Sequence, residues 1–197
     1  MGYSKVKIFN LALNRLGVSS AIQSNTQEDP RAILLNNVYE LSRDEVLEAH
    51  DWSFANAYRE ISASTESSPD PNYLYALTLP EDCIAPRALI DIGDKQEKKF
   101  EPAIGSNNQK IILTNTNPAI LRYTKRITNE SLFTAGFVRA LSYKLAAETG
   151  YSITGSREKE EINERRYEAT LVRSIIFDAR KSEPHDQDDN DFTDSRY

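Results

Sequence analysis

Four acidic residues in the middle of the chain are the first candidates for chemistry: Glu60, Glu81, Asp82 and Asp91. Two carboxylates in one cleft can hydrolyse a glycosidic bond, because one acts as general acid and the other as base or nucleophile. Such pairs meet only in three dimensions, so their spacing along the chain does not identify them. Exposed carboxylates are far more common than catalytic ones, and we therefore interpret all four as solvated charges at strand ends or turns.

Metal and cofactor chemistry has little support in the sequence. Cys83 is the only cysteine, and the chain has only two histidines, His50 and His185. These are too few ligands for a structural zinc site. An acidic run from Asp186 resembles the start of a calcium-binding loop, but Asp191 replaces its required glycine and Tyr197 its closing glutamate. The motifs of the common nucleotide-binding and hydrolytic enzymes are absent. We expect no cofactor and no metal, and we predict that the protein is not an enzyme.

An aromatic segment between an expected helix and the first expected strand could form a ligand pocket. Residues His50 to Phe54 include a histidine, an aspartate, a serine and two large aromatic side chains. Aromatic residues at such a junction usually fix the angle between the two elements, so we interpret this segment as core packing. For the same reason we interpret Cys83 as a small buried residue and not as a nucleophile.

Size and hydropathy favour one folded body without a membrane anchor. The chain has 197 residues, of which 39% are hydrophobic, and this is enough for a core. Its longest apolar stretches fall far short of the roughly 20 residues that cross a bilayer. The N-terminal residues lack the apolar region of a signal peptide, and we expect the protein to be made and kept in the cytoplasm or to leave it without secretion.

The formal net charge of -6 is concentrated at the C-terminal end. Residues 182–197 contain six acidic residues and one arginine, so the remaining body is nearly neutral. Its basic residues, such as Arg122, Lys125 and Arg126, do not form a strongly basic surface for nucleic acid. We expect the chain from about Pro184 onward to be disordered in the free protein and to become ordered by docking on a partner. Its few apolar residues do not offset the roughly 1–2 kcal/mol per residue lost in fixing a backbone.

Helical periodicity and capping residues predict four helices. Ser4 and the pair Asp29-Pro30 supply starts for the first two, and Gly150 stands near the expected end of the third. The last helix has a charged first half and an apolar stripe of Ile162, Ala169, Val172, Ile176 and Ala179. The predicted ranges are 4–17, 30–50, 131–150 and 156–181.

Alternating apolar residues predict five or six antiparallel strands between the second and third helices. The turn-rich segment from Ser62 to Pro71 is expected to be a loop within this insert. Strand signals lie at Trp52, Phe54 and Tyr58 and again from Tyr73 to Leu79, where apolar residues alternate with smaller or polar ones. Further strands are expected from Arg87 to Ile92, Lys99 to Ala103, Lys110 to Leu113 and Ile120 to Ile127. The predicted fold is α+β and mainly helical: four helices in two pairs, with a small antiparallel β subdomain inserted between them at residues 52–127. The body covers residues 1–181 and an extended, flexible acidic C-terminal tail covers residues 182–197.

Several short segments match a known family in their order and spacing. They are His50-Asp-Trp-Ser-Phe-Ala55 with Arg59, Leu79-Pro-Glu-Asp-Cys83, Leu121-Arg-Tyr123, Ser131-Leu-Phe133, Leu145-Ala-Ala-Glu148 and Ile153-Thr-Gly-Ser156. Over most of its length the chain resembles the head-to-tail adaptor, or tail tubular protein A, family of short-tailed bacteriophages. Phe192 departs from the family pattern, which has tryptophan near the end of the chain.

The resemblance implies a structural protein of the virion. Adaptor subunits form a ring, commonly a dodecamer, between the portal protein and the tail nozzle protein (tail tubular protein B). The genome DNA passes through this ring during ejection without sequence-specific binding. The implied place is the head-to-tail interface of the tail, after assembly in the host bacterial cytoplasm.

Two groups of residues are predicted to make contacts in such an assembly. The tail is expected to contact the portal or a neighbouring subunit through Asp186, Asp188, Asp189, Asp191, Phe192 and Tyr197. The last helix is expected to pack beside a neighbour through Glu161, Arg165, Glu168 and Arg173.

Two other classes of function stay open. A tail-associated cell-wall hydrolase would use paired carboxylates such as those named above. A regulatory module that binds DNA or protein is disfavoured, because the sequence contains no basic recognition helix.

Overall fold

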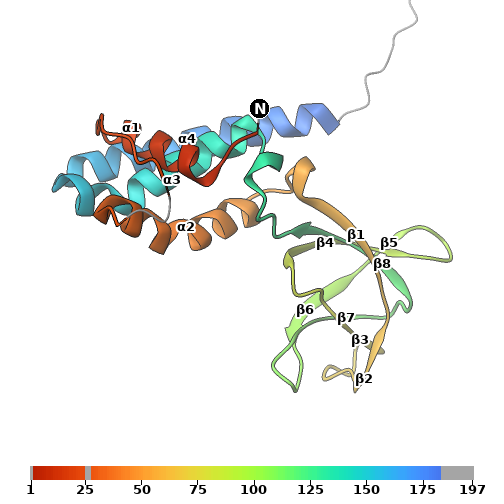
Figure 1. The fold of residues 1–197 in the computed structure, drawn as a ribbon. Helices are drawn as coiled ribbons and strands as arrows, with labels where there is room; N and C mark the ends of the chain where they lie inside the picture. The colour runs from red at the N-terminus through yellow and green to blue at the C-terminus, as the bar shows by residue number, and fades with distance from the viewer. Residues whose placement is uncertain (1, 25–27, 183–197) are drawn as a thin grey trace, which may run out of the picture.

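The computed structural model describes residues 2–24 and 28–182. The described residues form four α-helices and eight strands. Figure 1 shows that the helices lie together and that the strands project from one side of them. The strands lie between the second and third helices in chain order. The strands occupy the part of the chain where the β insert was expected, whereas the predicted acidic tail lies outside the described residues apart from Ser182.

The helices begin where the sequence supplies caps. The Ser4 hydroxyl accepts from the backbone N–H of Lys7, and the Asp29 carboxylate accepts from the N–H of Arg31, with Pro30 in the first turn. Both predicted starts are confirmed. The helices are α1 (Lys5–Arg15), α2 (Pro30–Glu48), α3 (Ala135–Thr154) and α4 (Arg157–Ser182).

The third helix is displaced from its predicted range of 131–150. Residues Glu130–Leu132 form a separate 3-10 turn, and the hydroxyl of Thr134 caps α3 by accepting from the N–H of Phe137. Gly150 does not end the helix, since α3 continues to Thr154. A side chain at position 150 would come within 3.2 Å of the Glu160 backbone. Gly150 permits α4 to pack closely on α3, and the left-handed residue that ends α3 is Gly155 (φ 69°).

The helices do not form the two separate pairs that we predicted. Helix α3 contacts α1, α2 and α4, so one helix lies at the centre of a single layer. The core of this layer contains buried residues from all three of α1, α2 and α3, including Phe9, Leu35 and Leu141. None of the helices within residues 2–24 and 28–182 is long and apolar enough to cross a membrane.

The β part consists of two four-stranded antiparallel sheets, in the orders β1-β8-β4-β5 and β2-β3-β7-β6. The sheets share a hydrophobic core that includes Leu77 and Ile112 from one sheet and Leu89 and Leu121 from the other. The strands are β1 (Asn56–Ile61), β2 (Ala63–Ser67), β3 (Tyr75–Thr78), β4 (Cys83–Asp91), β5 (Glu97–Lys98), β6 (Phe100–Ile104), β7 (Lys110–Thr114) and β8 (Ala119–Lys125).

The predicted fold class is therefore wrong in its proportions. The chain is α+β, with two sheets and a core of their own, and not a mainly helical protein with a small β insert. The strand signal at Tyr73–Leu79 contains β3, and the four later predicted strands coincide with β4, β6, β7 and β8. The first signal, from Trp52 to Tyr58, covers a 3-10 turn at Ser53–Ala55 and only the start of β1. The polar segment Ala63–Ser67 was expected to be a loop, but its backbone pairs with β3. Backbone pairing of this kind leaves no hydrophobic pattern in the sequence.

Phe137 in α3 offers a direct test of this packing. Its ring lies 5.4 Å from that of Trp52, 5.1 Å from that of Phe54 and 4.7 Å from that of Phe133, measured between centroids. We expect Phe137→Ala to lower the free energy of unfolding by about 3–5 kcal/mol, because it leaves a cavity at the centre of this cluster. Urea unfolding followed by the fluorescence of Trp52, the only tryptophan, measures the change.

Leu132→Ala is the matched control. Leu132 is 54% exposed and close in sequence, so its loss should change the free energy of unfolding by no more than about 0.5 kcal/mol. A loss below about 1 kcal/mol for Phe137→Ala would contradict the packing described.

Candidate interaction site at the end of helix α4

The segment from His50 to Ser53 joins the helices to the sheets. Trp52 is only 1% exposed, and its indole Nε1 donates to the Val46 carbonyl oxygen at 2.7 Å. Its ring belongs to the helical core and contacts Phe54 and Phe137. The prediction that this aromatic segment packs in the core is confirmed.

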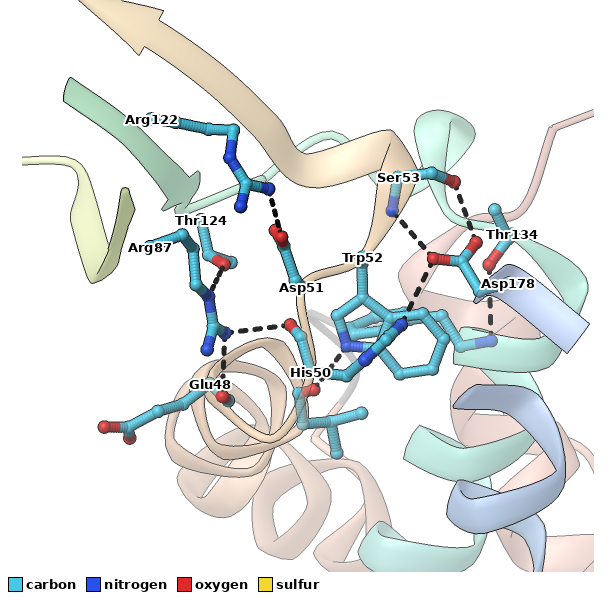
Figure 2. A network of polar contacts seen from close by, with 12 residues as sticks. Glu48, His50, Asp51, Trp52, Ser53, Arg87, Arg122, Thr124, Thr134 and Asp178 are labelled. Carbon is cyan, nitrogen blue, oxygen red and sulfur yellow. Dashed lines mark hydrogen bonds and ion pairs between the residues drawn. The ribbon is translucent and has the colours of Figure 1, made fainter. Parts of the chain in front are cut away.

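Two arginines tie the first sheet to the end of α2 (Figure 2). Arg87 in β4 donates from Nη2 to the carbonyl oxygens of Glu48 and His50, each at 2.9 Å. These oxygens belong to the last residues of α2 and its exit, where helix carbonyls need donors. Arg122 in β8 pairs with Asp51. The orientation of the β part therefore depends on charged hydrogen bonds as well as on packing.

The carboxylate of Asp178 fixes α4 to the same junction. Asp178 is 6% exposed and accepts from the Ser53 backbone N–H at 2.8 Å and from the Ser53 hydroxyl at 2.7 Å. His50 Nε2 lies 3.4 Å from Asp178 Oδ2, the oxygen that accepts from the Ser53 backbone N–H. Figure 2 shows all three residues meeting between the end of α4 and the start of β1.

Serine, histidine and aspartate in one place suggest a catalytic triad, but their order excludes one here. A nucleophilic serine must donate to histidine, which is in turn held by aspartate. The hydroxyl of Ser53 donates to Asp178 instead, and Asp178 lies between the other two. We therefore interpret this group as a structural clamp. The sequence prediction missed Asp178 as a functional residue.

In helix α4 the most buried positions hold polar side chains, and several large apolar side chains are exposed. Its buried positions include the polar residues Asn163 (1% exposed), Ser174 (9%) and Asp178 (6%). Ser174 donates to the Gly136 carbonyl oxygen at 3.2 Å, which holds α4 against the start of α3. The spacing of these polar residues, eleven and then four positions, puts them on one helix face. This spacing was the sequence pattern from which the buried polar face of α4 could have been predicted.

Three large apolar side chains in this half of α4 are exposed to solvent, although Leu171 packs against the helical core. Val172 is 57% exposed, Ile176 49% and Phe177 66%. Four of the five residues of the predicted apolar stripe are exposed, and only Ile162 is half-buried. Figure 1 shows the last turns of α4 extending beyond α1 and α2. Large apolar side chains gathered on a projecting helix are typical of an interaction surface.

Beside this surface lies a groove of about 430 Å³ between the start of α3 and the end of α4, which we call the α3–α4 groove. Arg139 of α3 and Arg173 of α4 line it and are both exposed. Within the described part of the chain, neither guanidinium forms an ion pair. Phe177 supplies an apolar wall, and Trp52 and Asp178 also contribute to the lining.

The predicted contact residues of the last helix face solvent. Glu161, Arg165, Glu168 and Arg173 are all exposed, and Glu161 and Arg165 form an ion pair at 3.7 Å. Of the four, Arg173 borders the α3–α4 groove. The predicted tail contacts lie outside the described residues: Asp186, Asp188, Asp189, Asp191, Phe192 and Tyr197.

The basic residues of β8 and its exit are neutralised by nearby acids. Arg126 Nε lies 2.9 Å from an oxygen of Asp44, and Lys125 Nζ lies 3.3 Å from an oxygen of Asp82. Arg122 pairs with Asp51, as described above. This segment therefore does not present a row of free positive charges to nucleic acid.

Three of the four candidate carboxylates lie around one open depression. Glu60, Glu81 and Asp82 line it, whereas Asp91 accepts from the backbone N–H groups of a turn elsewhere. Glu60 and Glu81 are exposed. A depression open to water does not provide the dry surroundings that keep a general acid protonated.

Cys83 and the metal-binding side chains offer no alternative site in the described part. Burial raises the pKa of the Cys83 thiol to about 11, and the side chain is 2% exposed, as predicted for a structural cysteine. Residues 2–24 and 28–182 contain no group of three or more His, Cys, Asp or Glu side chains that could hold a metal ion.

No protein-family model matches this sequence, and no curated protein matches it either. The structure and the residues themselves therefore carry the functional proposal.

The clamp can be tested by a double-mutant cycle. We expect Asp178→Ala to lower the free energy of unfolding by about 1.5–3 kcal/mol, because it leaves both donors of Ser53 without their charged acceptor. Ser53→Ala in the Asp178→Ala background should then cost much less than it does alone, with a coupling energy of at least about 0.5 kcal/mol. Glu168→Ala on the exposed side of α4 is the control and should have little effect. Additive losses would show that Ser53 and Asp178 do not act as one unit.

Proposed function

We propose that this protein is the structural subunit of a ring-shaped head-to-tail adaptor of a short-tailed bacteriophage. In this role it joins the portal protein to the tail nozzle protein and forms part of the DNA ejection channel. The observation that carries the proposal is the outward apolar face of α4, formed by Val172, Ile176 and Phe177. Burial of a large apolar side chain contributes about 1.5–3 kcal/mol, so a neighbouring copy that covers this face gains substantially.

The position of this face supports a ring in preference to a two-fold dimer. The outward face of α4 and the α3–α4 groove adjoin at Phe177, which belongs to both. The face is otherwise formed by the apolar residues Val172 and Ile176, and the groove is otherwise lined by residues that include Arg139 and Arg173. If each binds a different surface of the next subunit, the contact is head-to-tail. A head-to-tail contact generates a closed ring when its rotation closes.

The charge distribution supports a channel through which DNA slides. Each phosphate contact adds salt-sensitive affinity and would retard passage of the genome. Arg122, Lys125 and Arg126 are paired with acids, and the body of the chain is nearly neutral by formal charge. A ring of such subunits would hold DNA weakly.

The β part suits a second contact, which in this proposal is made with the nozzle. It has its own core and projects from the helical layer, so a partner can bind it without disturbing the helices (Figure 1). Tyr58, Leu74 and Ile104 are each at least 60% exposed on this part. The protein would then work in the virion, after assembly in the bacterial cytoplasm.

Assembly with the portal protein encoded in the same genome tests the proposal. We expect rings attached to portal particles in negative-stain images of the mixture, and we expect Phe177→Glu and Ile176→Glu to reduce them at least tenfold. Each change places a charge on a surface that must lose its water. Leu41→Glu on α2 is the matched control, because Leu41 and Phe177 are both 66% exposed. If portal particles stay bare with the unchanged protein, the proposal is wrong.

A turbidity assay tests the competing hydrolase function. In our proposal the purified protein neither clears a peptidoglycan suspension nor hydrolyses nucleotides. If the protein were a hydrolase, its carboxylates would lie in the depression around Glu60 and Glu81, so the variant is made there. Lysis by the unchanged protein that disappears in Glu81→Gln would overturn the non-enzymatic function.

A further inference from the structure

We propose that the α3–α4 groove receives the acidic C-terminal segment, residues 183–197, of a second copy of this chain. The inference rests on the proposed ring, and it adds the partner and the chemistry of one subunit contact. The candidate occupant is thus a peptide with carboxylates and one or two aromatic side chains.

The groove has the chemistry to bind such a peptide. Arg139 and Arg173 approach it from two different helices, and neither forms an ion pair within the described ranges. Arginine is well suited to carboxylates, because its planar guanidinium can donate two parallel hydrogen bonds. The start of α3 lies in the same lining and adds the positive end of a 20-residue helix. Phe177 offers an apolar contact for an aromatic side chain.

The segment that follows α4 has the complementary composition. Residues 183–197 contain six acidic residues and one arginine, together with Phe192 and Tyr197. Fully extended, a segment of this length reaches about 50 Å at roughly 3.3–3.6 Å per residue. A compact chain of this size has a radius of gyration of about 16 Å. The segment is therefore long enough to reach the groove of an adjacent subunit.

A neighbouring copy is a better acceptor than the same chain. The groove residues of α4, Thr170 to Asp178, precede the helix end at Ser182, so the segment would have to reverse at once to reach its own groove. A second copy placed beside the end of α4 can be reached without that reversal.

Photo-cross-linking of the full-length protein tests the proposal. Phe192 is replaced by p-benzoylphenylalanine, and equal amounts of ¹⁵N-labelled and unlabelled protein are mixed under the conditions of ring assembly. We expect cross-links between labelled and unlabelled copies, located by mass spectrometry in residues 134–139 or 170–178. Raising the salt concentration before irradiation should weaken them, because exposed charge pairs are screened within about 10 Å at 0.1 M.

Charge reversal in the groove supplies the specific readout. Arg139→Glu combined with Arg173→Glu should reduce the cross-links at least fivefold, whereas Arg157→Glu combined with Arg166→Glu should leave them unchanged. The control pair consists of exposed arginines on α4 that do not line the groove. The neutral pair Arg139→Gln and Arg173→Gln should give an intermediate loss, and circular dichroism of each variant checks that the fold is kept.

The outcomes separate this inference from the adaptor function. Cross-links confined to single copies, or located outside the groove, overturn the inference even where the images show rings on portal particles. Cross-links between copies in the groove, without rings or portal binding, support the groove contact and overturn the adaptor function. Equal cross-linking of the charge-reversed and unchanged proteins would show that the two arginines take no part in the contact.

Discussion

The buried carboxylate of Asp178 is the interaction on which the arrangement of this protein depends. It accepts two hydrogen bonds from Ser53, 125 positions earlier in the chain, and so attaches the end of α4 to the junction between helices and sheets. A charged group of 6% exposure is stable only with such partners. Because this side of α4 faces inward, the opposite side, with Val172 and Ile176, must face solvent. One hydrogen-bonded group thus determines which surface is offered to a partner.

The junction also fixes the orientation of the β part relative to the helices. Trp52 packs in the helical core, while the neighbouring residues Asp51 and Ser53 bond to β8 and α4. Arg87 adds bonds from β4 to the end of α2. A force on the β part therefore acts directly on the element that holds α4. In the proposed ring, this connection would couple the nozzle contact to the contact between subunits.

Local signals in the sequence located the elements, and contacts between distant residues decided their arrangement. Ser4 and Asp29 capped the helices that they predicted, and alternation marked β4, β6, β7 and β8. The division into two sheets was not predictable, because β1 pairs with β8 across the whole insert. The apolar stripe of α4 was found, but periodicity does not tell which face is covered. The α3–α4 groove is lined by residues of α3 and α4 that are about 35 positions apart, so no local sequence pattern predicts it.

The central claim is that the outward face of α4 becomes covered when the protein assembles. Hydroxyl-radical footprinting of free and assembled protein measures this directly, side chain by side chain. Our account predicts that the oxidation of Phe177 and Ile176 falls at least fivefold on assembly, while Leu41, with the same exposed fraction as Phe177, stays equally reactive. Equal oxidation of Phe177 in free and assembled protein would contradict it.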